Sequence, residues 1–147
     1  MSFTCVIDAS VAVALYVADS SSEKADALFA HLAARRPAVF HVPDLFFAEC
    51  LSVLRKHMLR YGYAHVDRDV DRLHGLSLRV TLCIDLLRNA ADVSLATGIS
   101  AYDAFYVSLS QRLEAPLVSN DHRLLRAMAG QPYDVQSLSD FDIPPLK

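Results

Sequence analysis

Residues 4–15 read TCVIDASVAVAL, an apolar run that a single acid, Asp8, interrupts. Residues 3–7 are apolar apart from Thr4, a pattern that predicts a strand buried on both faces of a parallel sheet. Ser10 then begins an apolar helical run that extends to about residue 17. Because functional groups gather at the carboxyl ends of strands in open α/β sheets, Asp8 stands at a position typical of such a site.

Strand-like and helix-like segments alternate along the rest of the chain, which favours an α/β class with a mainly parallel central sheet flanked by helices. Loops are short, and there are no repeats or linkers, so we expect a single domain over residues 1–147. Further strands are predicted at 39–42, 79–84, 117–119 and 133–135, and further helices at 22–35, 44–62, 66–76, 85–97, 101–113 and 122–129.

Composition limits the classes of protein that fit. Of the 147 residues, 53% are hydrophobic and 21% charged, which indicates a globular rather than a disordered chain. Three cysteines lie in apolar stretches without CxxC spacing, so we expect buried thiols and a reducing compartment. No signal peptide or membrane-length apolar run is apparent, and we expect a soluble cytoplasmic protein with no membrane partner.

The charge pattern leaves two interpretations open. A net charge of −3 argues mildly against a nucleic-acid binder. Cations nevertheless gather in residues 54–60 and 122–126, where they form either a basic rim around an acidic site or solvated helix faces. Asp67, Asp69 and Asp71 alternate with arginines, a pattern typical of a solvated helix face.

Four acids lie within or beside apolar stretches. They are Asp8 in TCVIDASVAVAL, Glu49 in LFFAECLSVL, Asp103 in GISAYDAFYV and Asp121 in APLVSND. Buried acids are usually paired or bound to metal, and no Lys or Arg occurs in these stretches. Carboxylates that converge without cations repel one another unless a hard cation lies among them. The pattern therefore predicts a Mg²⁺ or Mn²⁺ site that acts on phosphates.

Each acid also has a structural alternative. Asp8 fits a turn residue whose carboxylate is satisfied by amides of the following helix, and Asp121 fits an ordinary helix N-cap. Glu49 points into an apolar helix face and fits a buried ion pair with an arginine. Asp103 fits a capping box with Ser100. Ser10 is placed either to cap its helix or to direct a hydroxyl at the site.

Four motifs in order resemble the PIN-domain ribonucleases, and most nearly the VapC toxins of prokaryotic toxin–antitoxin pairs. These are IDAS at 7–10, PDLFFAE at 43–49, GISAYDAFY at 98–106 and LVSND at 117–121. The resemblance implies a metal-dependent endoribonuclease with an RNA substrate, an inhibitory antitoxin partner and a homodimeric state. It implies that the metal site, and with it the catalytic site, consists of Asp8, Glu49, Asp103 and Asp121, with Ser10 and Ser119 at supporting hydroxyl positions.

Two positions depart from the pattern that the resemblance implies. Ser52 stands where family members often have Asn, which removes an amide near the site. Asn120 stands where some members carry another acid, and this departure leaves open whether a second metal ion is bound. Other function classes are a phosphotransfer domain phosphorylated on Asp8, a catalytically silent RNA- or partner-binding module and a housekeeping RNA-processing nuclease. The phosphotransfer interpretation is weak, because position 10 is Ser and no Lys lies near a strand end.

Overall fold

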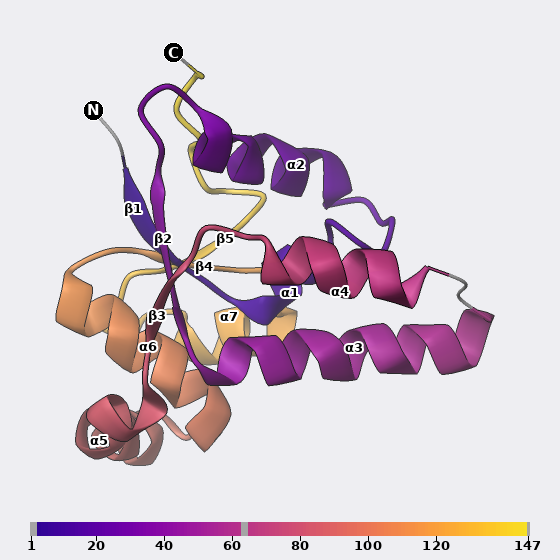
Figure 1. Cartoon of the computed structure of the whole chain (residues 1–147). Helices are drawn as coiled ribbons and strands as arrows, with labels where there is room; N and C mark the ends of the chain where they lie inside the picture. The colour runs from indigo at the N-terminus through magenta and orange to yellow at the C-terminus, as the bar shows by residue number, and fades with distance from the viewer. Residues whose placement is uncertain (1–2, 63–64, 147) are drawn as a thin grey trace.

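The computed structural model describes residues 3–62 and 65–146, and its described part is built around one sheet (Figure 1). Five strands pair in the order β3-β2-β1-β4-β5, and every pair is parallel. The predicted α/β class and the parallel sheet are thus confirmed, while residues 1–2, 63–64 and 147 lie outside the described residues. The strands are β1 (Thr4–Ile7), β2 (Val39–Pro43), β3 (Arg79–Thr81), β4 (Leu117–Ser119) and β5 (Val135–Ser137).

Helices cover both faces of this sheet. Parallel crossovers are almost always right-handed, and the strand order reverses direction at β1. Helices α1 to α4, which lead to β2 and β3, therefore lie on the face opposite α5, α6 and α7. The helices are α1 (Ala9–Val13), α2 (Ser22–Ala30), α3 (Leu45–Tyr61), α4 (Val66–His74), α5 (Leu87–Thr97), α6 (Ala101–Leu113) and α7 (His122–Met128).

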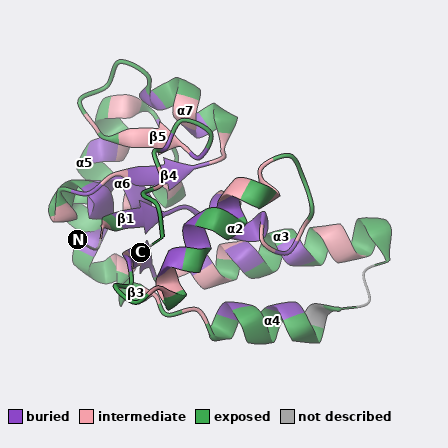
Figure 2. Ribbon diagram, turned by 90° about the horizontal axis from the view of Figure 1, so that it is seen from above, coloured by how far each residue is buried: buried purple, intermediate pink, exposed green. Residues whose placement is uncertain are grey.

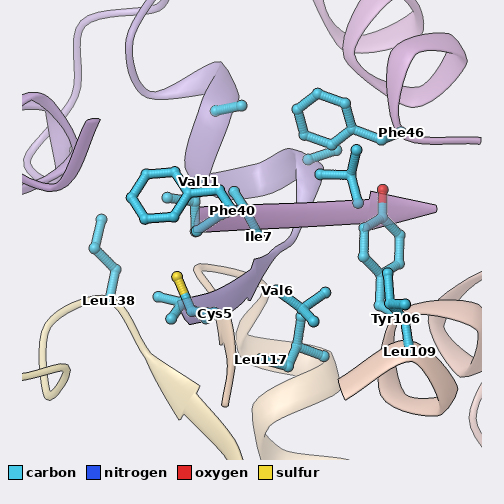
Figure 3. Packing of buried hydrophobic residues seen from close by; sticks show 14 of the residues in the cluster. Cys5, Val6, Ile7, Val11, Phe40, Phe46, Tyr106, Leu109, Leu117 and Leu138 are labelled. Atoms are coloured by element: carbon cyan, nitrogen blue, oxygen red, sulfur yellow. The ribbon is translucent and has the colours of Figure 1, made fainter. Parts of the chain in front are cut away.

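The core lies between the sheet and these helices. Strands β1 and β4 are buried almost throughout, and α6 packs across β1, β2 and β4 (Figures 2 and 3). Cys5 and Cys50 are wholly buried free thiols, in line with the sequence, whereas Cys83 is only partly buried. Ends of helices follow local chemistry: Gly62 and Gly98 adopt the left-handed conformation that closes α3 and α5.

Several boundaries differ from the predictions. The strand expected at 79–84 ends at Thr81, because residues 83–86 form a 3₁₀ turn, η2 (Cys83–Leu86), whose first amide donates to the Asp44 carboxylate at 2.9 Å. The helix expected at 22–35 ends at Ala30 and continues as a 3₁₀ turn, η1 (His31–Ala33). The last strand begins at Val135 rather than at residue 133.

The prediction of a solvated face on α4 is wrong for Asp69. Its side chain is wholly buried, whereas Asp67 and Asp71 are exposed. Asp69 and Leu73, four residues apart, share the face of α4 that turns inward, and α4 packs against α3. Arg68 accompanies the buried carboxylate, with its Nε 3.6 Å from Oδ1 of Asp69.

Candidate active site

Asp8 lies where the strand order changes direction. It directly follows β1, and its backbone N–H donates to Val118 of the adjacent β4 at 3.0 Å. Crevices outside the carboxyl ends of strands at such a switch point are the usual ligand sites of open α/β sheets. Asp8 is only 6% exposed, so its charge needs compensation from neighbouring groups.

Two serine hydroxyls provide part of that compensation. Ser10 Oγ and Ser119 Oγ both donate to Oδ2 of Asp8, each at 2.7 Å. No amide of α1 bonds to the Asp8 side chain, so the alternative of a carboxylate satisfied by its helix is wrong. Ser10 is the second residue of α1 and not its cap. Both hydroxyls therefore hold one carboxylate oxygen of Asp8 in place.

The same hydroxyls accept bonds from the segment that carries Asp121. The Asn120 N–H donates to Ser10 Oγ at 2.9 Å, and the Asp121 N–H donates to Ser119 Oγ at 3.0 Å. Asp121 caps α7 through Oδ1, which accepts from the amides of Arg123 and Leu124 at 3.0 and 3.3 Å. The cap interpretation of Asp121 is thus correct, and it leaves the second oxygen, Oδ2, for other partners.

Glu49 reaches the site from the fifth residue of α3. It is partly buried, and Tyr106 Oη of α6 donates to its Oε1 at 2.7 Å. Figure 3 shows the Tyr106 hydroxyl directed toward the side of the core where Phe46 of α3 lies. No described Arg or Lys forms an ion pair with Glu49, so the interpretation as a buried ion pair fails for the described residues.

Asp103 lies in the first turn of α6, where capping and an inward position coexist. Ser100 Oγ accepts the Asp103 N–H at 3.1 Å, which confirms Ser100 as the N-cap. The Asp103 carboxylate is partly buried. The charge of Asp121 raises its pKa, and the charge of Arg123 lowers it. Arg123 thereby brings part of the basic run at 122–126 to the site.

The four acids share one electrostatic environment. Burial is the largest cause that raises the pKa values of Asp8, Glu49 and Asp103. Repulsion from Asp121 raises all three further, and Asp103 also raises the pKa values of Asp8 and Glu49. The fold therefore brings the acid that follows β1 and acids of α3, α6 and the start of α7 into one region of the molecule.

This donor set fits a hard divalent cation. Oxygen ligands and an excess of negative charge are what Mg²⁺ and Mn²⁺ require, and among the described residues Arg123 is the one cation that lowers any of these three pKa values, that of Asp103. Among the described residues, however, no group of three or more His, Cys, Asp or Glu side chains is placed so that it could hold a metal ion. The acids are near enough for their charges to affect one another's pKa values, and their role as metal ligands is a proposal.

The raised pKa values predict how metal-free protein responds to pH. Between the unfolded pKa values, about 4, and the higher folded values, the native state holds protons that the unfolded chain has released. Stability therefore falls as pH rises through this window. We expect the melting temperature of metal-free protein to be a few degrees higher at pH 5 than at pH 7.

The matched comparison is the Asp8→Asn protein. Burial lowers the pKa of His41, and this shift makes stability rise with pH, opposite to the effect of the acids. The informative quantity is therefore the difference between the two proteins in how their melting temperatures change with pH. Asp8→Asn should gain less on acidification than the wild type, by differential scanning fluorimetry in EDTA. Identical pH profiles would show that Asp8 does not titrate in this window.

Comparison with known proteins identifies the family. Residues 5–130 match the PIN domain, which is most of the chain. The chain belongs to the PIN-domain family. It is 32% identical over 124 residues to ribonuclease VapC3 of Pyrobaculum aerophilum, covering 81% of this chain and 90% of that protein.

Solved structures share the PIN fold at lower sequence identity. A toxin–antitoxin complex from Klebsiella pneumoniae has a TM-score of 0.65 at 12% identity, over 91% of this chain and 97% of the other. Mycobacterium tuberculosis VapC20, a sarcin–ricin loop cleaving toxin, has a TM-score of 0.62 at 19% identity, over 86% and 95%. At these identities the likeness supports the fold alone.

Two contributors to the site were not assigned from sequence. Tyr106 is on the inward face of α6 with Asp103, but nothing in the pattern pairs it with Glu49, 57 positions away. In the sequence, Asn120 was noted only as a departure from the family pattern beside Asp121. In the structure its backbone N–H donates to Ser10, and its side-chain amide donates to Ser21.

Proposed function

We propose that this chain is a divalent-metal-dependent endoribonuclease and the toxin of a toxin–antitoxin pair. The observation that carries the proposal is the position of the buried Asp8 at the switch point of a PIN-domain sheet, where Ser10 and Ser119 hold its carboxylate and also accept from the amides of residues 120 and 121. The relationship to ribonuclease VapC3 supports RNA as the substrate. The proposed metal ligands are these four carboxylates.

Each residue has a role in this proposal. When bound, Mg²⁺ or Mn²⁺ supplies a Lewis acid for the phosphate and lowers the pKa of a bound water. Ser10 and Ser119 orient the Asp8 carboxylate through the hydrogen bonds to its Oδ2. Asp121 orients the attacking water with the oxygen that the α7 cap leaves free. Glu49 is oriented in turn by Tyr106, which is a positioning residue.

The Tyr106→Phe substitution tests this positioning role. Groups that hold a metal ligand through a hydrogen bond typically contribute about 10- to 100-fold to metal affinity or activity. We expect Tyr106→Phe to weaken Mn²⁺ affinity within that range, measured by calorimetric titration. Tyr102→Phe, on the same helix but 66% exposed, is the control and should bind Mn²⁺ as the wild type does. Equal affinities in both variants would remove Tyr106 from the site.

The proposed partners are an antitoxin protein and a second copy of the chain, in the cytoplasm. Structural neighbours include a toxin–antitoxin complex from Klebsiella pneumoniae and VapBC2 of Rickettsia felis bound to promoter DNA. An arginine of an antitoxin suits an acidic site, since a guanidinium pairs with two carboxylate oxygens. No helix in the described residues is long and apolar enough to span a membrane.

Expression in bacteria tests the toxin role. We expect the chain alone to arrest growth, and co-expression with the protein encoded just upstream to relieve the arrest. Asp103→Asn is the matched control and should not arrest growth, because removal of the charge prevents metal binding. Normal growth at high expression, from a preparation that still cleaves RNA, would instead favour a housekeeping RNA-processing nuclease.

A further inference from the structure

A polar cavity lies beside the candidate active site. It has a volume of about 310 Å³ and is formed by the loop before α2, the start of α7 and the segment that follows β5. Figure 1 shows that last segment running beside α2. Residues that contribute hydrogen-bonding groups to the lining include Ser20, Ser21, Lys24, Asn120, His122 and Ser139. We call it the Lys24 cavity.

Asn120 connects the Lys24 cavity to the acids. Its backbone N–H donates to Ser10 Oγ, which in turn donates to Asp8. Its side-chain Nδ2 donates to Ser21 Oγ on the cavity wall at 3.1 Å. Asn120 therefore supports Asp8 through Ser10 and also lines the cavity, so the cavity adjoins the acids.

The charges of the lining differ from those of the acid cluster. Lys24 Nζ donates to the Ser139 carbonyl at 2.5 Å, which holds the ammonium at the wall with further N–H groups for a ligand. The cavity also contains one acid, Asp19, whose Oδ1 already accepts from the N–H and the hydroxyl of Ser21 at 2.7 and 2.6 Å. A phosphate therefore meets the Lys24 ammonium here, beside an acid that has one of its two oxygens engaged by its own turn.

The lining favours a sugar-phosphate over a base. The imidazole of His122 is the single aromatic ring among the described residues that line the cavity, and the other side chains of the lining offer no ring for base stacking. Lysine, serine and asparagine side chains are instead the groups that contact phosphate and sugar in nucleic-acid complexes. Serine hydroxyls both donate and accept, as recognition of a ribose 2′-OH requires.

We propose that the Lys24 cavity binds the ribose phosphate adjacent to the scissile phosphodiester of single-stranded RNA. The proposal rests on the ribonuclease function proposed above and adds a sequence-independent subsite to it. Lys24 neutralises the phosphate, and the surrounding serines and Asn120 bond to the sugar-phosphate. The subsite positions the RNA strand across the acids.

Binding of fluorescein-labelled octauridine tests this subsite. Affinity is measured by anisotropy in the Asp103→Asn background, in which the RNA remains intact. Adding Lys24→Met should raise the Kd about 3- to 10-fold. It should also make the negative slope of the logarithm of the association constant against the logarithm of salt concentration shallower by about 0.7, the value for one lost phosphate contact to a single strand. A merely structural role of Lys24 would leave that slope unchanged.

The matched control is Arg36→Met in the same background. Arg36 is exposed and precedes β2, so it lies at the opposite, amino-terminal edge of the parallel sheet. It should leave the Kd and the salt slope unchanged. Equal Kd values and slopes for Lys24→Met and Arg36→Met would overturn the subsite.

A cleavage assay separates this proposal from the one on which it rests. In the otherwise wild-type chain, Lys24→Met should raise KM with kcat changed less than about 2-fold, because the lost contact is made before the chemical step as well as during it. Cleavage with an unaltered KM would refute the subsite and keep the nuclease. Lys24-dependent RNA binding without any cleavage by the wild type would refute the nuclease and support the cavity as an RNA site.

Discussion

Asp8→Asn is expected to lower the rate of RNA cleavage by at least about 100-fold, the size of effect that follows loss of one major electrostatic contribution. Asn keeps the shape of the side chain, and its carbonyl oxygen still accepts from Ser10 or Ser119. It removes the charge that attracts the cation at the most buried of the four acids. Asp103→Asn should have an effect of similar size, because Asp103 influences both Asp8 and Glu49.

The control for both variants is Asp92→Asn, which makes the same chemical change at an exposed position of α5. Its cleavage rate should equal that of the wild type, measured on one RNA substrate in Mn²⁺ with circular dichroism to verify folding. An Asp8→Asn protein that cleaves at the wild-type rate would refute the assignment of the metal site.

The second large effect concerns stability. Crowded ionised acids destabilise the metal-free native state, and a cation that binds only this state stabilises it by mass action. At about 100 times its Kd, a ligand contributes about 2.7 kcal/mol. We expect Mn²⁺ to raise the melting temperature of the wild type by several degrees and that of Glu49→Gln much less.

Glu23→Gln is the matched control for the stability experiment, since Glu23 is exposed in the first turn of α2. It should respond to Mn²⁺ as the wild type does. If Mn²⁺ shifted the wild type and Glu49→Gln equally, the ion would be bound at another place in the molecule.

Local patterns predicted most of the fold. The apolar run before Asp8 gave β1, and Gly62 and Gly98 marked the ends of two helices, because only local conformation is needed to recognise them. The end of β3 was missed, since it depends on a contact between Asp44 and Cys83, 39 positions apart. Asp69 was misjudged for a similar reason: α3 buries a face of α4 whose sequence resembles a solvated one.

The candidate site was predictable to the extent that its residues were chemically out of place. An acid among apolar neighbours is visible in the sequence, and this singled out Glu49 and Asp103. Partners that join distant segments are not visible there. The bond from Tyr106 to Glu49 and the links from Asn120 to Ser10 and Ser21 exist only once the sheet and its helices are assembled.

The most direct test of the central claim is a crystal structure of the protein soaked in Mn²⁺, with anomalous diffraction used to locate the ion. The claim is that Asp8, Glu49, Asp103 and Asp121 form one divalent-metal site. We predict an anomalous peak bounded by Asp8 and Asp103, with carboxylate oxygens at distances typical of Mn²⁺ and no such peak in Asp8→Asn crystals. A fully soaked crystal with no peak among these four acids, or with its peak elsewhere, would contradict the account.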